Sequence, residues 1–353
     1  MLLFSLFLFQ PFPVCSADIG AYYFPGWHST SSYWNDLKGL PGSRSPGRSW
    51  PEIEPLLGFY SEEQQWVTEK HIDMAASYGI GFFAYDWYWN GKSTYLNHAI
   101  DGYLQARNKK RLKFALLWAN HSATPATLQE YSAMVDFWLK NYFHDKQYLK
   151  IDNKPVVIIF SPKQLRDNAE KFGKTTKELL TLARDKARLK GLAGIYFIGA
   201  STASSYWVRD YLPSSGYDAI TAYNYHSRGF TGEFTGNEDI PYANDYSELL
   251  AGYKSHWEWI LANSTLPYMV PISAGWDKRP WGSNTPHDHC DSTPASFRQM
   301  LTEAKKVMSR HADKTNGLGI VYAWNEFGEG GYIEPTKKWK YQYLEAIKDV
   351  FGK

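Results

Sequence analysis

Residues 80–88 read Ile-Gly-Phe-Phe-Ala-Tyr-Asp-Trp-Tyr, an apolar run in which the only charge, that of Asp86, lies near the C-terminal end. A run of this kind is typical of a β-strand that is buried on both faces of a sheet. Seven similar runs cover residues 18–25, 113–120, 154–161, 194–201, 217–225, 268–276 and 318–326. Candidate strands are therefore spread over the whole length of the chain.

Helical patterns separate most of these runs. They cover residues 62–78, 128–143, 176–189, 245–262, 294–311 and 337–351. Strands that alternate with helices along a whole chain predict the α/β class, here a single closed (β/α)8 TIM barrel. Four tryptophans in the helical patterns are expected to belong to the core, and they are Trp66, Trp138, Trp257 and Trp259.

An open, doubly wound sheet is the main alternative fold. It would place a glycine-rich phosphate loop after its first strand. The first run here continues as Pro25-Gly26-Trp27 and has no such loop, so the barrel is the better prediction. No linker or low-complexity segment interrupts residues 18–353, and we expect one catalytic barrel domain there.

The first 17 residues differ from the rest of the chain. An apolar stretch, residues 1–10, is followed by prolines and small residues, as in a secretory signal peptide. We expect residues 1–17 to be removed and the mature protein to be secreted or periplasmic. No later stretch has about 18 consecutive apolar residues, so no membrane span is expected after signal removal. Cys15 would leave with the signal, and Cys290 could then form no intrachain disulfide.

The composition excludes some partners and favours others. The 38 Lys and Arg residues nearly balance the 36 Asp and Glu residues, which leaves no overall basic surface for nucleic acid. Aromatic residues, by contrast, make up 17% of the chain, and 15 of them are tryptophans. No phosphate-binding loop is evident, and we expect a monomer without a cofactor.

Polar and aromatic side chains gather at the C-terminal ends of the candidate strands, which face the active site in a TIM barrel. Trp and Tyr rings stack on the faces of sugars, while carboxylate, amide and imidazole groups bind sugar hydroxyls. We therefore expect an oligo- or polysaccharide substrate. The predicted substrate-binding residues are Tyr22, Tyr23, Trp27, Asp86, Trp87, Trp89, Asn120, His121, Tyr223, Tyr225, Trp276, Asp277, Arg279, Trp324 and Asn325.

Some of these residues have a structural alternative. Asp86 would equally suit a buried acid that caps backbone groups, and Asn120 with His121 would suit a turn amide beside a core imidazole. Two long segments that follow strands, residues 26–61 and 276–292, are expected to lie over the same end of the barrel.

Residues 326–329 read Glu-Phe-Gly-Glu and carry the clearest catalytic signal. Hydrolysis of a glycosidic bond commonly uses two carboxyl groups, one of which protonates the leaving oxygen. Nearby glycines, Gly328 among them, permit a tight turn that would bring both carboxyls to one cavity. Glu326 and Glu329 are the predicted catalytic residues. The alternative is that one of them forms a structural ion pair with Lys or Arg.

Residues 287–291, His-Asp-His-Cys-Asp, look like a metal site, because alternating His and Asp side chains can ligate zinc. They lie in a polar loop, however, and no second cluster of ligands is evident. A contact with substrate and an inert solvated loop are the other interpretations, and we name no metal ligand.

Five of these segments together resemble a known family. They are residues 22–27 (YYFPGW), 83–89 (FAYDWYW), 117–121 (LWANH), 275–281 (GWDKRPW) and 324–330 (WNEFGEG). They are similar to the WbsX-type proteins, which in turn are similar to glycoside hydrolase family 99, the endo-α-mannosidase and endo-α-mannanase family. The resemblance extends from about Ile19 to Pro335. Family 99 itself usually has Trp-His where this chain has Phe327-Gly328, so the chain resembles the WbsX-type branch.

The resemblance implies a (β/α)8 barrel and a retaining glycoside hydrolase that cleaves an α-linked glycan. Carried over to this sequence, Glu326 would be the base on the sugar 2-hydroxyl and would give a 1,2-anhydro sugar intermediate. Glu329 would protonate the leaving group and then activate water, for which it needs a raised pKa. Two alternatives stay open: a glycosyltransferase, as the WbsX name suggests, and a carbohydrate-binding barrel without catalysis.

Overall fold

The computed structural model of the chain describes residues 18–230 and 241–352. The predicted signal peptide, residues 1–17, lies outside the described residues. Within the described part of the chain, eight parallel strands form the barrel. They are β1 (Asp18–Tyr23), β2 (Ile80–Trp89), β4 (Lys113–Trp118), β6 (Lys154–Ile159), β7 (Tyr196–Ala200), β8 (Ala219–Thr221), β9 (Val270–Ser273) and β12 (Leu318–Tyr322).

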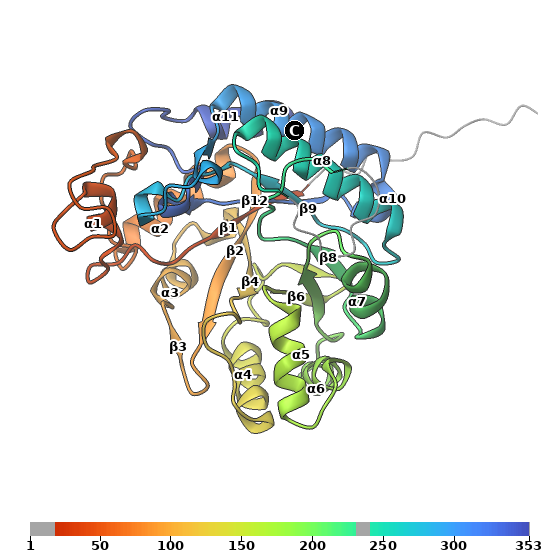
Figure 1. Cartoon of the computed structure of the whole chain (residues 1–353). Helices are drawn as coiled ribbons and strands as arrows, with labels where there is room; N and C mark the ends of the chain where they lie inside the picture. Colours follow the sequence, from red (N-terminus) through yellow and green to blue (C-terminus); the bar gives the residue numbers. More distant parts are fainter. Residues whose placement is uncertain (1–17, 231–240, 353) are drawn as a thin grey trace, which may run out of the picture.

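The strands pair side by side in the order β8-β7-β6-β4-β2-β1-β12-β9. The two ends of this row meet, because Ile220 of β8 and Tyr268, just before β9, form a parallel bridge. The amide of Met269 donates a hydrogen bond to the carbonyl of Ile220 over 2.9 Å. The row of strands thus curls into a barrel (Figure 1), and the predicted fold is confirmed.

Helices separate the strands and cover the outside of the barrel (Figure 1). They are α1 (Tyr33–Lys38), α2 (Gln65–Ser77), α3 (His98–Gln105), α4 (Leu128–Asn141), α5 (Pro162–Lys171), α6 (Thr176–Leu189), α7 (Leu212–Ser214), α8 (Tyr246–Asn263), α9 (Pro294–Arg310), α10 (Ala312–Thr315) and α11 (Gln342–Phe351). No helix in residues 18–230 or 241–352 is both long and apolar enough to cross a membrane.

Each helical stretch predicted from the sequence overlaps one of these helices. α6 begins where predicted because Thr175 and Glu178 form a capping box, which satisfies the free amides of its first turn. The sequence pattern does not single out α3 or α5, whose 8 and 10 residues give little room for a clear periodicity.

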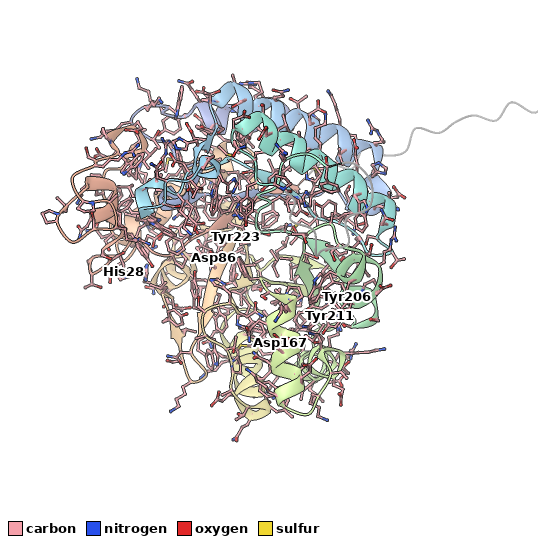
Figure 2. All side chains as sticks on the ribbon, in the orientation of Figure 1. His28, Asp86, Asp167, Tyr206, Tyr211 and Tyr223 are labelled. Atoms are coloured by element: carbon pink, nitrogen blue, oxygen red, sulfur yellow. The ribbon has the colours of Figure 1, made fainter. Side chains whose placement is uncertain are left out.

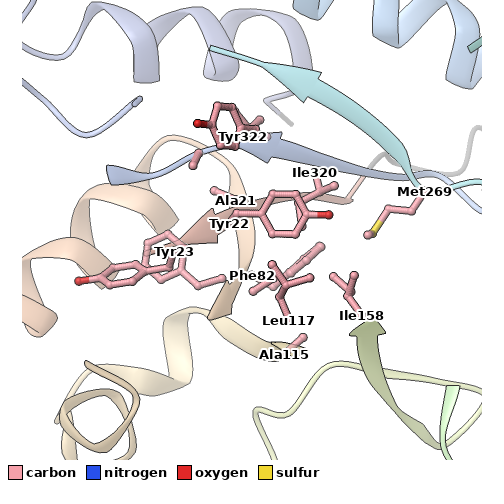
Figure 3. Close-up of a cluster of buried hydrophobic side chains, with 14 of the residues drawn as sticks. Ala21, Tyr22, Tyr23, Phe82, Ala115, Leu117, Ile158, Met269, Ile320 and Tyr322 are labelled. Carbon is pink, nitrogen blue, oxygen red and sulfur yellow. The ribbon is translucent and has the colours of Figure 1, made fainter. Parts of the chain in front are cut away.

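The interior of the barrel is filled by apolar and aromatic side chains from the strands (Figure 3). Tyr22, Phe82, Ile158 and Ile320 are each at most 1% exposed. Gly20 makes room for this packing, since a Cβ atom there would lie 2.2 Å from the Phe82 ring. The packed interior supports the strand ends above it, where the active site of such a barrel lies.

The predicted tryptophan core is partly correct. Trp138 and Trp257 are fully buried, and Trp259 packs half-buried against the core. Trp66 was wrongly predicted to be a core residue, because 46% of it is exposed. α2 buries the face that includes Val67, and Trp66 lies outside that apolar stripe.

Short elements join the strands and helices at both ends of the barrel. They are the strands β3 (Thr94–Tyr95), β5 (Lys150–Ile151), β10 (Gly275–Trp276), β11 (Cys290–Asp291), β13 (Asn325–Glu326) and β14 (Gly331–Tyr332), a π-helical segment over Tyr206–Tyr211, and 3₁₀ turns over Pro51–Ile53, Lys109–Arg111, Arg279–Trp281, Pro286–His289 and Phe327–Glu329. β13 follows β12 and pairs antiparallel with β14, so the chain doubles back over the barrel.

The turn between β13 and β14 depends on glycine. Gly330 follows the 3₁₀ turn with a φ of 73°. Glycine adopts this backbone conformation readily, and a Cβ atom at this position would lie 2.5 Å from the amide nitrogen of Asp277. The tight turn predicted from the glycines is therefore present. It brings Glu326 and Glu329 to the wall of one cavity.

Candidate active site

A cavity of about 420 Å³ opens at the C-terminal ends of the strands. The two long segments reach it, because Tyr33 and Arg44 come from the loop after β1 and Trp276 and Trp281 from the segment after β9. The lining residues are Phe24, Tyr33, Arg44, Asp86, Tyr88, Tyr95, Leu96, His121, Ser122, Phe160, Tyr223, Asn224, His226, Trp276, Trp281, Glu326 and Glu329.

Asp86 and Glu326 meet in this cavity through Tyr223. The Tyr223 hydroxyl oxygen lies 3.0 Å from Oδ2 of Asp86 and 2.8 Å from Oε1 of Glu326. Figure 2 shows Asp86 and Tyr223 beside each other near the centre of the molecule. The three side chains come from β2, from the residues after β8 and from β13, so the closed barrel is what brings them together.

These two hydrogen bonds constrain how many protons Asp86, Tyr223 and Glu326 share. A phenol has one hydrogen and can donate it to only one of the two carboxyls. The other contact is a hydrogen bond only if that carboxyl is protonated and donates to Tyr223. Either Asp86 or Glu326 can hold this proton, because burial raises the pKa of both carboxyls and the Tyr223 hydroxyl favours the charged form of each.

Burial raises the pKa of all three acids in the cavity. Loss of solvation is the largest cause for Asp86, for Glu326 and for Glu329. Repulsion from Glu329, and then from Asp86, raises the pKa of Glu326 further. Carboxyls that perturb one another in a cleft are characteristic of catalytic sites.

Glu329 has two protein partners in the cavity. Its Oε2 accepts a hydrogen bond from the Tyr322 hydroxyl over 2.9 Å, and its Oε1 lies 3.7 Å from Nζ of Lys278. Both contacts favour the carboxylate, yet burial outweighs them and the pKa of Glu329 is raised. The raised pKa expected for this residue is confirmed. The alternative prediction was that one of the two glutamates forms a structural ion pair. Glu329 does pair with Lys278, but the distance between the charged atoms is long and the lysine side chain is 41% exposed.

Two carboxylate oxygens in the cavity have no hydrogen-bond partner among the described residues. They are Oδ1 of Asp86 and Oε2 of Glu326, and both are buried. The indole nitrogens of Trp276 and Trp281, which line the same cavity, likewise have no acceptor there. Buried polar groups are normally paired, so these atoms are available to a ligand whose hydroxyls can both donate and accept hydrogen bonds.

The structure brings only some of the predicted site residues to this cavity. Those that line it are Asp86, His121, Tyr223, Trp276, Glu326 and Glu329. Those that do not line it are Tyr22, Tyr23, Trp27, Trp87, Trp89, Asn120, Tyr225, Asp277, Arg279, Trp324 and Asn325.

The alternation of side chains along β2 explains two of these misplacements. Asp86 and Tyr88 line the cavity, whereas Trp87 and Trp89 stack on each other with ring centres 5.7 Å apart. Both tryptophans also pack against Phe137 of α4. Successive side chains of a strand point to opposite faces, so these tryptophans belong to the barrel–helix interface. Neither tryptophan therefore lines the cavity in which it was predicted to contact sugar.

The two predicted asparagines hold backbone segments together. Asn325 accepts a hydrogen bond from the amide of Phe24 over 2.9 Å and donates one to its carbonyl over 3.0 Å. Asn120 accepts from the amide of Ser161 over 2.7 Å and donates to its carbonyl over 2.8 Å. Since these amides already bind the protein, their role lies in the framework and not in the predicted substrate contact.

The remaining predicted residues outside the cavity also have protein partners. Their hydrogen bonds join Tyr22 to Ala222, Tyr23 to His71, Trp27 to Asn325, Tyr225 to Tyr268 and Arg279 to Asp277. Trp324 is fully buried and packs on Phe83. These side chains therefore already have partners within the protein.

Sequence reasoning missed several residues of the cavity wall. Tyr88 could have been found, because it lies two residues after Asp86 on the same strand and so shares its face. Arg44 could not, because it lies in a loop without periodic signal. Its guanidinium lies 4.3 Å from the ring centre of Trp281 and pairs with Asp36 over 2.5 Å.

The segment at residues 287–291 turns out to contact the cavity indirectly. Asp288 is used within the loop, where its carboxylate accepts hydrogen bonds from Ser283 and Thr285. His287 is buried and contacts His226, a lining residue. Among residues 18–230 and 241–352, no three His, Cys, Asp or Glu side chains gather as a metal site.

A second hollow of about 280 Å³ adjoins the cavity at the ends of β6, β7 and β8. The two hollows share Phe160, Tyr223 and Asn224. Ser201 and Thr202 add hydroxyl groups to its lining. The site is therefore longer than one pocket, which suits a ligand with more than one sugar unit.

Solved structures share the fold of this chain. The glycoside hydrolase family 99 endo-alpha-mannosidase from Bacteroides thetaiotaomicron, in complex with bis-tris propane, has a TM-score of 0.64 and 16% identity, with 95% of this chain and 97% of that chain covered. A structure described as a glycoside hydrolase-like protein has a TM-score of 0.67 and 16% identity, with 98% of each chain covered. The chain therefore has the TIM-barrel fold of these glycoside hydrolases.

The sequence defines the family. The profile described as glycosyltransferase WbsX matches residues 43–347, which is most of the chain, so the chain belongs to the WbsX family. A curated relative, the uncharacterized protein WxcX of Xanthomonas campestris pv. campestris, is 23% identical over 371 residues, with 95% of this chain and 49% of WxcX covered. The chain thus spans about half the length of the curated relative it matches.

Proposed function

We propose that this protein is a retaining glycoside hydrolase that cleaves an α-linked glycan, with Glu326 as base and Glu329 as general acid and base. One observation carries the proposal: unpartnered carboxylate oxygens of Asp86 and Glu326 lie in one aromatic-walled cavity with Glu329, whose pKa is raised. Such a cavity has acceptors for sugar hydroxyls, aromatic rings for sugar faces and a carboxyl able to hold a proton near neutrality.

The first step would form the anhydro sugar. Glu326 takes the proton from the sugar 2-hydroxyl, and the 2-oxygen forms a bond to C1 while the bond from C1 to the leaving oxygen breaks. Glu329 gives its proton to that leaving oxygen. The raised pKa of Glu329 keeps this proton available. The mechanism requires an ionised Glu326, and the hydrogen bonds of Tyr223 to both carboxyls then require the proton to be on Asp86.

The second step would reverse the proton movements. Glu329, now a carboxylate, takes a proton from water, and the water oxygen forms a bond to C1 while the bond from C1 to the 2-oxygen breaks. Glu326 returns its proton to the 2-oxygen. Two inversions at C1 give net retention of configuration. Tyr322 and Lys278 would steady the charge on Glu329 between the two steps.

A glycosyltransferase is the second candidate, and one observation favours it: the family that the chain belongs to is described by that activity. It would use the same cavity for a sugar donor and an acceptor. The first strand, however, is followed by no glycine-rich phosphate loop. A barrel that binds carbohydrate without catalysis would keep the aromatic wall and would not depend on either glutamate.

A substrate panel tests the proposal. The protein is incubated with α-linked polysaccharides that contain mannose or deoxyhexose, and in parallel with nucleotide sugars and the same glycans as acceptors. We expect new reducing ends from at least one polysaccharide and none from the Glu329→Gln variant. Transfer from a nucleotide sugar would establish the second candidate instead. Binding of glycan with no product from either reaction would establish a binding protein.

A further inference from the structure

His226 lines the cavity but was not among the predicted site residues. Its ring lies against Trp276, with ring centres 4.3 Å apart. Its Nδ1 lies 2.9 Å from Nε2 of His287. The other nitrogen of His287, Nδ1, lies 2.7 Å from the carbonyl oxygen of Ala243. Two imidazoles thus form a line that starts at the cavity and ends on the backbone.

The backbone carbonyl fixes the position of every proton along this line. A carbonyl oxygen only accepts, so Nδ1 of His287 must be the donor in that contact. A neutral imidazole carries one proton, and Nε2 of His287 is therefore a bare acceptor. His226 must donate to it through Nδ1. By the same rule, Nε2 of His226 carries no hydrogen and is an acceptor.

Both imidazoles are neutral under ordinary conditions. Burial, followed by the neighbouring His287 and Lys278, lowers the pKa of His226 to about 3. Burial also lowers the pKa of His287, which outweighs the opposite effects of Ala243 and Asp288. A doubly protonated ring, which would change the direction of the hydrogen bonds, is thus disfavoured at both positions.

We propose that His226 is a specificity-determining residue whose bare Nε2 accepts a hydrogen bond from a hydroxyl of the bound sugar. The inference deepens the proposed function and rests on it. No described residue donates to Nε2, while the ring faces the same cavity as Trp276 and Glu329. An acceptor at this place favours a neutral hydroxyl and repels a carboxylate or sulfate oxygen, which cannot donate.

His287 acts in this scheme as a positioning residue. It touches no cavity space itself, but its bond to Ala243 sets the tautomer of His226. Without His287, Nδ1 of His226 would lose its acceptor, and the proton would be free to move to Nε2. The cavity would then present a donor where it now presents an acceptor.

Nitrogen NMR of the full chain labelled with ¹⁵N-histidine tests the tautomer without any substrate. The chain has 10 histidines, and the His226 signals are those lost in His226→Gln. We expect a protonated Nδ1 and a bare Nε2 for His226 in the wild type. We expect a protonated Nε2 in His287→Phe, a change that loss of packing alone would not cause. A protonated Nε2 in the wild type would overturn the inference.

Kinetics on the glycan found in the panel test the role. In His226→Asn the amide can still reach His287 but offers no acceptor at the place of Nε2, and KM should rise roughly three- to tenfold with kcat within about twofold. In His226→Gln the longer side chain places an oxygen near that position and should restore most of the loss. Equal KM values in the wild type and His226→Asn would overturn the role.

The two readouts separate the failure of this inference from the failure of the proposed function. A protonated Nε2 in an active hydrolase defeats the inference alone. If no glycan is hydrolysed, binding of bis-tris propane, a polyhydroxylated amine, replaces KM as the readout, measured by calorimetry on the same variants. Weaker binding by about threefold or more in His226→Asn supports the acceptor role, and unchanged binding overturns it.

Discussion

Two groups of buried acids lie close together in this barrel, and they differ in their partners. We call Glu62 and Glu334 the framework acids, and Asp86, Glu326 and Glu329 the cavity acids. Glu62 accepts hydrogen bonds from the Trp27 amide over 3.0 Å and from Asn325 over 3.2 Å, and it pairs with His98 over 3.0 Å.

The second framework acid is satisfied in the same way. Glu334 accepts a hydrogen bond from the Tyr60 hydroxyl over 2.7 Å and pairs with His71 over 3.2 Å. It is 1% exposed, as is Glu62. Asp86 and Glu326 are almost as deeply buried, at 5% and 4%, yet each keeps an oxygen without a partner.

The comparison teaches that burial alone does not separate a structural acid from a functional one. The protein uses every oxygen of the framework acids to hold loops and strand ends in place. It leaves oxygens of the cavity acids open, at a cost in stability that a bound ligand would offset. Loss of a framework acid should therefore harm the fold, and loss of a cavity acid should harm the reaction.

The largest effect is expected from Glu326→Gln, which breaks the cavity group. The amide cannot act as a base, so the rate of reducing-end formation should fall by about 10²–10⁴-fold. Removal of a buried charge that lacks a strong ion pair should leave the thermal unfolding temperature unchanged or higher. Initial rates and a thermal melt measure both. A variant that keeps more than a tenth of the wild-type rate would contradict the assignment.

Glu334→Gln is the matched change in the framework group. The amide weakens charge-assisted hydrogen bonds to Tyr60 and His71, so the free energy of unfolding should fall by about 1.5–3 kcal/mol. The rate per folded molecule should stay within about threefold of the wild type, since this residue lines no part of the cavity. Urea unfolding and initial rates test this pair of results. An unchanged stability with a lost rate would reverse the roles of the two groups.

A smaller effect is expected at Asp86, because a protonated carboxyl and an amide can both donate a hydrogen bond to the Tyr223 oxygen. In Asp86→Asn the amide nitrogen can donate to the Tyr223 oxygen, as the protonated carboxyl does, and kcat/KM should fall by less than about threefold. Asp86→Leu removes that donor and the open oxygen, and kcat/KM should fall about tenfold or more. If Asn and Leu are equally inactive, Asp86 works as a carboxylate and the proton belongs on Glu326.

The smallest effect concerns pH. Activity requires an ionised Glu326, which is lost as the pH falls, and a protonated Glu329, which is lost as the pH rises. Burial raises both pKa values, so the bell-shaped profile of kcat/KM should lie at higher pH than for ordinary carboxyls, whose pKa is about 4.3. Its two limbs describe the interacting pair.

Lys278→Met sharpens this prediction. Lys278 favours the charged form of Glu329, so its removal should raise the pKa of Glu329 further and move the alkaline limb to higher pH. The exposed Lys190, which directly follows the last residue of α6, supplies the control Lys190→Met, whose profile should match the wild type. A shift of the limb to lower pH in Lys278→Met would contradict the electrostatic account.

The fold and the acids of the site could be predicted from the sequence, because both depend on local patterns. A strand that is buried on both faces has a continuous apolar sequence. The residue near its C-terminal end, such as Asp86 or Glu326, then lies at the mouth of the barrel. The direction of Trp87 could have been derived from alternation along β2. The partners of Glu62 could not, since Asn325 lies far away in the chain and only the folded barrel brings it near.

Aromatic residues were the weakest part of the prediction for the same reason. An excess of tryptophan and tyrosine at strand ends indicates a sugar site, but many of these rings, such as Trp27 and Trp324, pack beneath it. The loop residues Tyr33 and Arg44 do reach the cavity, but no pattern in the sequence predicts this position. Their placement depends on the path of a long loop over the barrel.

The central claim is that the cavity acids carry out hydrolysis, and the rate of reducing-end release by Glu329→Gln tests it most directly. The account predicts that this variant binds the glycan within about threefold of the wild type, while its rate falls by about 10²–10⁴-fold. A variant that binds equally well and releases reducing ends at the wild-type rate would contradict the claim.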